Sequence, residues 1–193
     1  MKNKISIFPV FLLFFLVHAA PLHAQDQPGR DKLTIEHPAR LVQKGSVPFS
    51  DTTRVFSNPK FEGLRKRYST IDGIVMIGVT DRQGNVLLKG PDNWTPPGGA
   101  VQSGEGWAEA ARRIIHSQLG EPVCLDHPVL VEQLHFQKKS SSKPLFSTYI
   151  LHLEASFCNG VPDLSADSSF AWFDSVPADA HPNHVGHIER YLR

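Results

Sequence analysis

The sequence has little net charge of either sign. Its 193 residues include 20 lysines and arginines against 19 aspartates and glutamates, which gives a formal charge of +1 with the histidines neutral. Proteins that bind nucleic acid or anionic membranes as their main partner normally carry a clearly basic surface. The one basic cluster, Arg65-Lys66-Arg67, is too short to change this balance. The composition therefore argues against both partner classes.

Long hydrophobic runs are also scarce. The run from Ile7 to Val17 is shorter than the roughly 20 residues that span a bilayer. It follows Lys2 and Lys4 and precedes small residues, which predicts a secretory signal peptide over residues 1–24. An uncleaved amphipathic anchor is the alternative. Cleavage would remove two lysines and no acidic residue, leaving 18 basic and 19 acidic groups, and we expect a secreted or periplasmic protein that is not bound to the membrane.

Cysteine is limited to Cys124 and Cys158. In an exported chain, two cysteines favour a disulfide. Strand-like runs over 123–136 and 146–157 flank a polar loop centred near Ser141, which predicts a hairpin. Opposing residue numbers in an antiparallel pair have a constant sum, here near 282, and the two cysteine numbers also add to 282. We therefore predict a disulfide between them, although one bulge would spoil this register; two free buried thiols are the alternative.

Regular patterning begins near Tyr68. Residues 25–65 are rich in Pro, Gly, Ser, Asp and Arg, and we predict an extended, partly disordered lead-in. Residues 66–193 are predicted to form one domain. Its predicted elements are a hairpin of strands over 71–79 and 86–89, a helix over 104–119, the 123–157 hairpin, a strand over 170–173 and a short closing helix. This order indicates an α+β fold, an αβα sandwich around a mixed sheet.

The helix predicted over 104–119 is amphipathic. At 100° per residue, one arc is apolar: Trp107, Ala110, Ala111, Ile114 and Ile115. The opposite arc is polar: Glu105, Glu109, Arg112 and His116. Ser103 is the predicted cap, Gly120 the predicted stop, and Glu109 is spaced to pair with Arg113. Gln118 does not fit, because it projects into the apolar arc.

Five residues in this region have a fixed spacing: Gly99, Glu105, Arg113, Ile115 and Gly120. Their spacing resembles the Nudix box, Gly-x5-Glu-x7-Arg-Glu-U-x-Glu-Glu-x-Gly-U, where U is bulky and apolar. The segments Trp94–Gly99 and Trp172-Phe173 agree with the family context, and the resemblance covers roughly residues 66–190. Nudix enzymes hydrolyse a nucleoside diphosphate linked to another group, using Mg²⁺ or Mn²⁺ to neutralise the diphosphate and activate water.

The resemblance implies roles for the matching residues. Glu105 and Arg113 would be catalytic, and Gly98, Gly99 and Gln118 would bind ligand. The Gly99 carbonyl and the Glu105 carboxylate would be the remaining metal ligands. A nucleotide or diphosphate would be the small-molecule partner.

Three family glutamates are missing. Ile114, Ser117 and Gln118 occupy their positions, and Glu121 replaces the last apolar residue. Isoleucine offers no oxygen ligand, while serine and glutamine offer only neutral ones. Gln118 is either a hydrogen-bonded residue at the core edge or an uncharged remnant of a metal-binding glutamate. Glu132 and Glu154 on later strands are candidates for one further carboxylate.

These departures leave two functional expectations. The first is an exported Nudix domain whose hydrolase activity is weak or altered and whose use of Mg²⁺ or Mn²⁺ is reduced or lost. The alternative is a non-catalytic module, which either binds a nucleotide or diphosphate or uses the scaffold only for interaction.

A second polar group lies near the carboxyl terminus. His181, His184 and His187 are spaced three apart, and three imidazoles can bind zinc. Pro182 and Gly186 argue against a rigid helix that would align them. The alternative is three exposed polar residues. His116, on the exposed face of the long helix, is not expected to be a ligand.

Overall fold

The computed structural model describes residues 35–162, 164 and 169–192. The predicted signal peptide over residues 1–24 lies outside the described residues. The elements in chain order are α1 (Pro38–Lys44), β1 (Phe49–Phe56), α2 (Asn58–Tyr68), β2 (Ile71–Val79), β3 (Val86–Lys89), β4 (Gly98–Gln102), α3 (Trp107–Leu119), β5 (Val123–Lys138), β6 (Phe146–Phe157), β7 (Phe170–Phe173) and α4 (Val185–Tyr191). None of the helices in this part of the chain is long and apolar enough to cross a bilayer.

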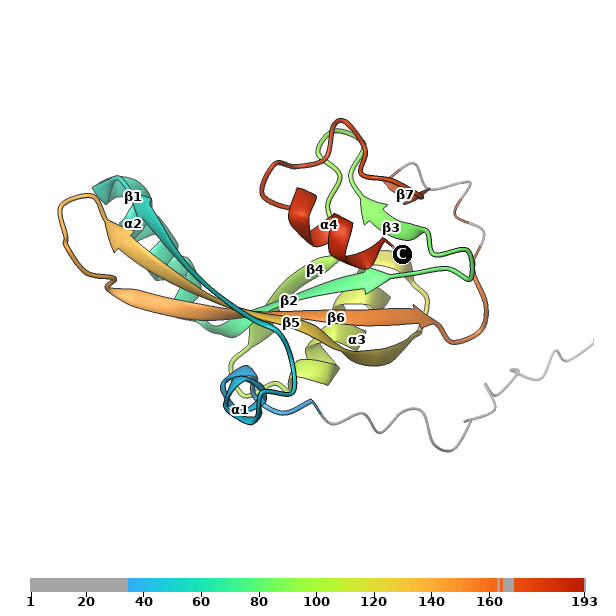
Figure 1. Cartoon of the computed structure of the whole chain (residues 1–193), viewed down its shortest axis with the longest axis horizontal. Helices are drawn as coiled ribbons and strands as arrows, with labels where there is room; N and C mark the ends of the chain where they lie inside the picture. Colours follow the sequence, from blue (N-terminus) through green and yellow to red (C-terminus); the bar gives the residue numbers. More distant parts are fainter. Residues whose placement is uncertain (1–34, 163, 165–168, 193) are drawn as a thin grey trace, which may run out of the picture.

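A five-stranded mixed sheet forms the centre of the fold, with strand order β1-β5-β6-β2-β4 (Figure 1). β1 is parallel to β5, and β2 is parallel to β6. The β5–β6 and β2–β4 pairs are antiparallel. The predicted 123–157 hairpin is therefore confirmed, and the mixed sheet is as expected.

Side-chain alternation along β2 separates two layers. Val75, Ile77 and Val79 are fully buried in the cluster that includes the apolar side of α3. Gly78 faces the other side, where the ring of Tyr191 in α4 packs so closely that a Cβ on Gly78 would lie 2.1 Å from it. The two helices cover opposite faces of the sheet (Figure 1), which confirms the αβα sandwich.

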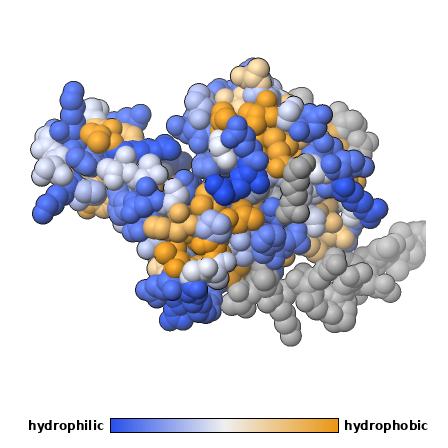
Figure 2. Space-filling view, viewed as in Figure 1, coloured by the Kyte–Doolittle hydropathy of each residue, from blue (hydrophilic) through white to orange (hydrophobic). Residues whose placement is uncertain are grey.

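The segment before Tyr68 differs from the expected extended lead-in. Residues 38–68 form α1, β1 and α2, and β1 pairs along its whole length with β5. The sequence signal is weak because no residue of β1 is buried and α2 buries only Phe61. β1 and α2 flank the far end of the β5–β6 hairpin (Figure 1), and together they form a largely hydrophilic lobe at the left of Figure 2.

The predicted hairpin of β2 and β3 is confirmed only at its turn, where Thr80 and Val86 form an isolated antiparallel bridge. The turn exists, since the Asp81 N–H donates to the Asn85 carbonyl (3.0 Å). However, β4 and β6 occupy both edges of β2, so β3 continues away from it. β3 instead pairs antiparallel with β7 in a separate two-stranded sheet on the α4 side.

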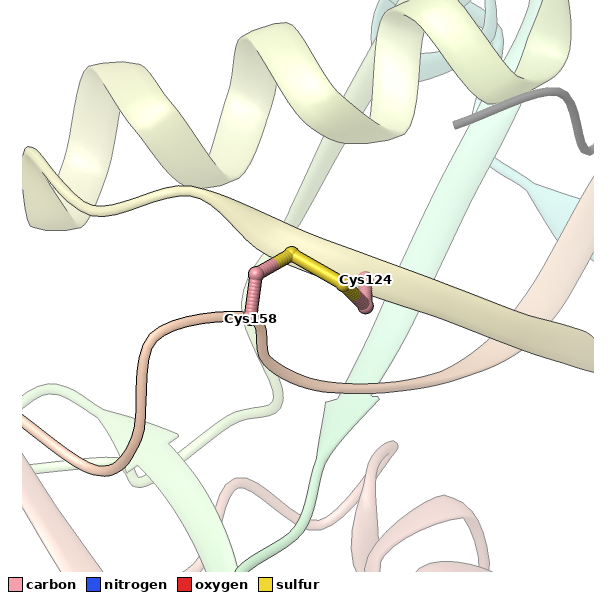
Figure 3. Close-up of a disulfide and its surroundings, with 2 residues drawn as sticks. All are labelled: Cys124 and Cys158. Carbon is pink, nitrogen blue, oxygen red and sulfur yellow. A yellow bond between two sulfur atoms is a disulfide. The ribbon is translucent and has the colours of Figure 1, made fainter. Parts of the chain in front are cut away.

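The predicted Cys124–Cys158 disulfide is present (Figure 3). Near the loop, the numbers of opposing residues add to 282, as for Leu130 and His152. Irregularities around Pro128 shift the register, so that Cys124 lies opposite Ser156. Cys158 follows the end of β6, and the two Cα atoms are 5.1 Å apart. The predicted disulfide is therefore confirmed, although the two cysteines are not directly opposite each other as the predicted register required. A disulfide can form between residues at this diagonal separation.

Candidate functional site

The long helix begins later than predicted. α3 starts at Trp107 and its N-cap is Gly106, not Ser103. The Gly106 N–H donates to Glu109 Oε2 (3.1 Å), which satisfies one unpaired donor at the helix start. Gly120 ends the helix with φ 72°, as predicted. The predicted apolar arc is buried throughout.

Glu105 lies just before the helix and is held by Arg113. Arg113 donates through Nε to Glu105 Oε1 (2.6 Å) and through Nη2 to Oε2 (2.7 Å), and Nη2 also reaches the Ala100 carbonyl (3.0 Å). This bidentate arrangement keeps the pKa of Glu105 below its usual range. The expected Glu109–Arg113 pair is wrong, because Glu105 offers two aligned acceptors while Glu109 caps the helix.

Gly98 and Gly99 lie in strand β4. They pair with Met76 and Val75 of β2. A Cβ on Gly98 would lie 2.7 Å from the Val75 carbonyl oxygen, and one on Gly99 would lie 3.1 Å from Ile114 Cδ1. A side chain at Gly98 would clash with the β2 backbone, whereas one at Gly99 would require Ile114 to shift by a few tenths of an ångström.

Gln118 links the end of the helix to this strand. Its Nε2 donates to the Gly98 carbonyl (3.2 Å). Its Oε1 is buried and has no hydrogen-bond partner among the described residues. The neighbouring Ser117 donates back to the Ile114 carbonyl (2.8 Å). Gly98, Gly99 and Gln118 are therefore brought together, whereas Glu105 and Arg113 form a separate pair beside Ala100.

A family model described as a NUDIX domain matches residues 70–184, more than half of the chain. The protein belongs to the Nudix family. Members of this family generally use divalent metal ions. No curated protein matches the sequence significantly.

Several solved Nudix structures are similar to this chain. One is a Nudix hydrolase from M. smegmatis, with 20% identity, coverage of 61% of this chain and 82% of that chain, and a TM-score of 0.44. Another is a Nudix hydrolase from Nitrosomonas europaea, with 18% identity, coverage of 63% and 88%, and a TM-score of 0.45. A third is a UDP-X diphosphatase, with 16% identity, coverage of 70% of each chain, and a TM-score of 0.45.

A histidine–carboxylate cluster lies on the other face of the sheet from the Nudix-box helix. Glu132 Oε2 contacts two imidazole nitrogens, His152 Nε2 at 2.8 Å and His187 Nε2 at 3.0 Å. His152 Nδ1 lies 3.1 Å from the Tyr191 hydroxyl, and His187 Nδ1 lies 3.2 Å from His184 Nδ1. The cluster thus joins β5, β6 and α4 through one hydrogen-bonded chain.

The structure brings the three C-terminal histidines near one another but does not direct all three to one point. His184 contacts His187, and the His181 and His184 rings are 5.1 Å apart, but only His187 reaches a carboxylate. Of the two candidate carboxylates, Glu132 joins this cluster. Glu154 Oε2 lies 3.7 Å from His127 Nε2 instead.

Burial and hydrogen bonding shift the acidities of this cluster. Burial alone would raise the pKa of Glu132, but hydrogen bonds from two imidazoles hold it far below its ordinary value. Burial lowers the pKa of His152 and lowers that of His184 to about 4. At neutral pH Glu132 is therefore ionised and accepts a hydrogen bond from the neutral imidazole of His152.

Two adjoining cavities open on this face of the sheet, with volumes of about 260 and 240 Å³. They share Tyr68, Ile74, Met76 and His184 as lining residues. The first also reaches Arg67 and the β4 backbone over residues 98–100. The second also reaches Arg54 and two members of the cluster, Glu132 and His187. The Nudix-box strand and the histidine cluster therefore border one depression, which is visible as the indentation beside the left lobe in Figure 2.

Proposed function

We propose that this Nudix domain binds a nucleotide-like diphosphate and hydrolyses it only weakly with Mg²⁺ or Mn²⁺. The observation that carries this proposal is the hydrogen bond from the Gln118 amide to the Gly98 carbonyl. By family resemblance, a metal-binding glutamate would occupy position 118. An amide satisfies the carbonyl directly, whereas a carboxylate in the same place would need a cation between the two oxygens.

The other box residues also fit a divalent cation poorly. Mg²⁺ prefers an octahedron of oxygen ligands, of which one or two are carboxylates. Both Glu105 oxygens are engaged by Arg113, and the side chain of Ile114 is buried and apolar. Loss of an outer-shell group alone typically lowers metal affinity or activity by about 10- to 100-fold. We therefore expect the loss of three anionic ligands to reduce Mg²⁺-dependent hydrolysis by more than that.

Binding is supported by the depression on the opposite face of the sheet. It combines two arginines, Arg54 and Arg67, with the half-buried backbone of β4 over residues 98–100, and both features suit phosphate oxygens. The proposed partner is a small nucleotide or diphosphate rather than nucleic acid. The Cys124–Cys158 disulfide and the predicted signal peptide together support a secreted or periplasmic location, because disulfides persist in oxidising compartments.

The non-catalytic alternative rests on the same Gln118 contact and differs in one measurable respect. Phosphate release should be measured on the purified, oxidised chain with ADP-ribose, sugar nucleotides and dinucleotides, each with Mg²⁺ and with Mn²⁺. Thermal shifts with the same ligands should be recorded in parallel. We expect stabilisation by at least one ligand and slow turnover that disappears in Glu105→Gln. Stabilisation without turnover would instead favour the binding module, and neither signal would favour an interaction scaffold.

A restoring variant sharpens this test. Ser117→Glu combined with Gln118→Glu returns two carboxylates to the box, and Ser117→Gln combined with the native Gln118 is the uncharged control. We expect the Mg²⁺-dependent rate to rise at least about 10-fold only in the charged variant. Fast turnover by the unmodified chain that survives Glu105→Gln would refute the proposal.

A further inference from the structure

We propose that Glu132, His152 and His187 form a binding site for one Zn²⁺-type transition-metal ion, with a fourth coordination position open to the adjoining cavity. This site goes beyond the proposed function, because it uses none of the Nudix-box residues; it lies on the face of the sheet opposite α3 and borders the cavity proposed to bind the diphosphate. Its ligand set also differs in kind. Two imidazoles and a carboxylate suit Zn²⁺ and its neighbours, whereas Mg²⁺ prefers oxygen ligands.

Strand alternation places the first two ligands. Glu132 of β5 and His152 of β6 both point to the α4 side, because their neighbours Val131 and Leu151 are buried on the α3 side. His187 approaches from the first turns of α4. Their ligand atoms all lie within 4.8 Å of one another, and His152 is completely buried. Three separate elements therefore direct ligand atoms to one point.

The distances are close to those of a metal-bound cluster. In a tetrahedral site with bonds of about 2.0 Å, neighbouring ligand atoms are roughly 3.3 Å apart. The Nε2 atoms of His152 and His187 lie 2.8 and 3.0 Å from Glu132 Oε2. Lengthening each of these two contacts by a few tenths of an ångström would bring it to this spacing, and all three ligand atoms lie within 4.8 Å of one another.

The outer hydrogen bonds remain satisfied when both Nε2 atoms bind a metal. Each imidazole then carries its proton on Nδ1. His152 Nδ1–H would donate to the Tyr191 oxygen, whose own O–H faces the Met76 carbonyl at 3.4 Å. His187 Nδ1–H would donate to His184 Nδ1. Metal-binding histidines typically have such partners, which fix the ring orientation.

The fourth position would face the cavity of about 240 Å³ that Glu132 and His187 line. Three protein ligands and an open position are typical of zinc sites that bind water or a ligand, whereas structural sites are closed by four protein ligands. Arg54 lines the same cavity. The open position therefore suits an anionic oxygen or a water molecule.

The test is a metal titration of the chelator-treated, oxidised chain without nucleotide. We expect one equivalent of Co²⁺ to produce the visible absorption of a four-coordinate site and Zn²⁺ to displace it. His187→Ala and Glu132→Gln should each weaken binding by more than about 100-fold, and His184→Ala, which removes an outer partner, by about 10-fold. The matched control is His116→Ala, since His116 is exposed on α3 and should leave binding unchanged.

Two results would overturn the proposal. One is less than one equivalent of tightly bound metal in the unmodified chain. The other is binding that survives both His187→Ala and Glu132→Gln but is lost in His181→Ala, which would place the ion among the C-terminal histidines. A second measurement uses the unmodified chain and so does not depend on variants that fold poorly. Zn²⁺ should shift the ¹⁵N resonances of Nε2 in His152 and His187, and unchanged resonances would also refute the site. Because no nucleotide is present, failure here is distinct from failure of the proposed diphosphate function.

Discussion

Replacing Gln118 with glutamate tests why this Nudix box carries an amide. In the native chain, Gln118 Nε2 donates to the Gly98 carbonyl at 3.2 Å. Gln118→Glu removes that donor and places an ionised oxygen opposite a carbonyl oxygen in a partly buried position. We expect the variant to be less stable when divalent cations are absent and to recover part of the loss when Mg²⁺ is added.

The expected loss follows from two contributions. Removing the hydrogen bond costs about 1 kcal/mol, and leaving a buried acceptor without a donor costs about 1–3 kcal/mol. For a domain of this size, 1 kcal/mol changes Tm by roughly 2–4 °C, so we expect a decrease of roughly 5–15 °C in EDTA. A cation bound between the two oxygens would restore about 1.4 kcal/mol when Mg²⁺ is at ten times its Kd.

The assay is thermal or urea unfolding of the oxidised chain in EDTA and in excess Mg²⁺. Gln118→Met is the matched control, because it keeps the side-chain length, removes the hydrogen bond and introduces no charge. We expect Gln118→Met to be destabilised less than the glutamate variant and to show no response to Mg²⁺. Equal stability of Gln118→Glu and the native chain in EDTA, or an equal Mg²⁺ response in all three proteins, would refute the reasoning.

Three further predictions concern the scaffold. The disulfide joins cysteines 34 residues apart, so its reduction should lower the free energy of unfolding by roughly 4 kcal/mol. Urea titration with and without reductant measures this loss, and an unchanged unfolding midpoint would contradict it. Arg113→Met should lower the free energy of unfolding by only about 1 kcal/mol, because the Arg113 side chain is 41% exposed. Since the folded pKa of Glu105 is lowered, the stability difference between native and variant should be complete above the unfolded pKa near 4.3 and should vanish as pH falls through the folded pKa. A stability difference that persisted in acid would argue against the ion pair. Gly78→Ala should lower the free energy of unfolding by about 1–3 kcal/mol, because the new methyl group would clash with the Tyr191 ring. The control Gly63→Ala lies in open space within α2 and should be neutral or stabilising by up to about 1 kcal/mol. Equal unfolding midpoints for these two variants would contradict the close packing of Tyr191 on Gly78.

Local sequence patterns were sufficient for several elements. The 3.6-residue period predicted the buried arc of α3, and Gly120 predicted its end. Two strand-like runs around a polar loop predicted the β5–β6 hairpin and brought the cysteines together. In each case the interacting residues belong to one helix or to adjacent strands, so the signal is contained in a short stretch of chain.

Pairing between distant segments was not visible in the same way. β1 has no buried residue, so its parallel pairing with β5 left no apolar alternation to detect. The local turn after β2 suggested a hairpin, but the edges of β2 were already occupied by β4 and β6. Which strand occupies an edge depends on competition between distant segments, and no local pattern records that outcome.

The same distinction holds for the two candidate sites. The sequence by itself determined the Nudix-box positions, since Gly99, Glu105 and Arg113 lie within one strand–helix unit at fixed spacing. It also contained a hint of the second site, because His152 interrupts an apolar run between Leu151 and Leu153. Only the tertiary structure decided that His152 meets Glu132 and His187, which lie 20 and 35 residues away in sequence. Their meeting requires the β5–β6 register and the docking of α4 through Tyr191, and both depend on long-range packing rather than on local periodicity.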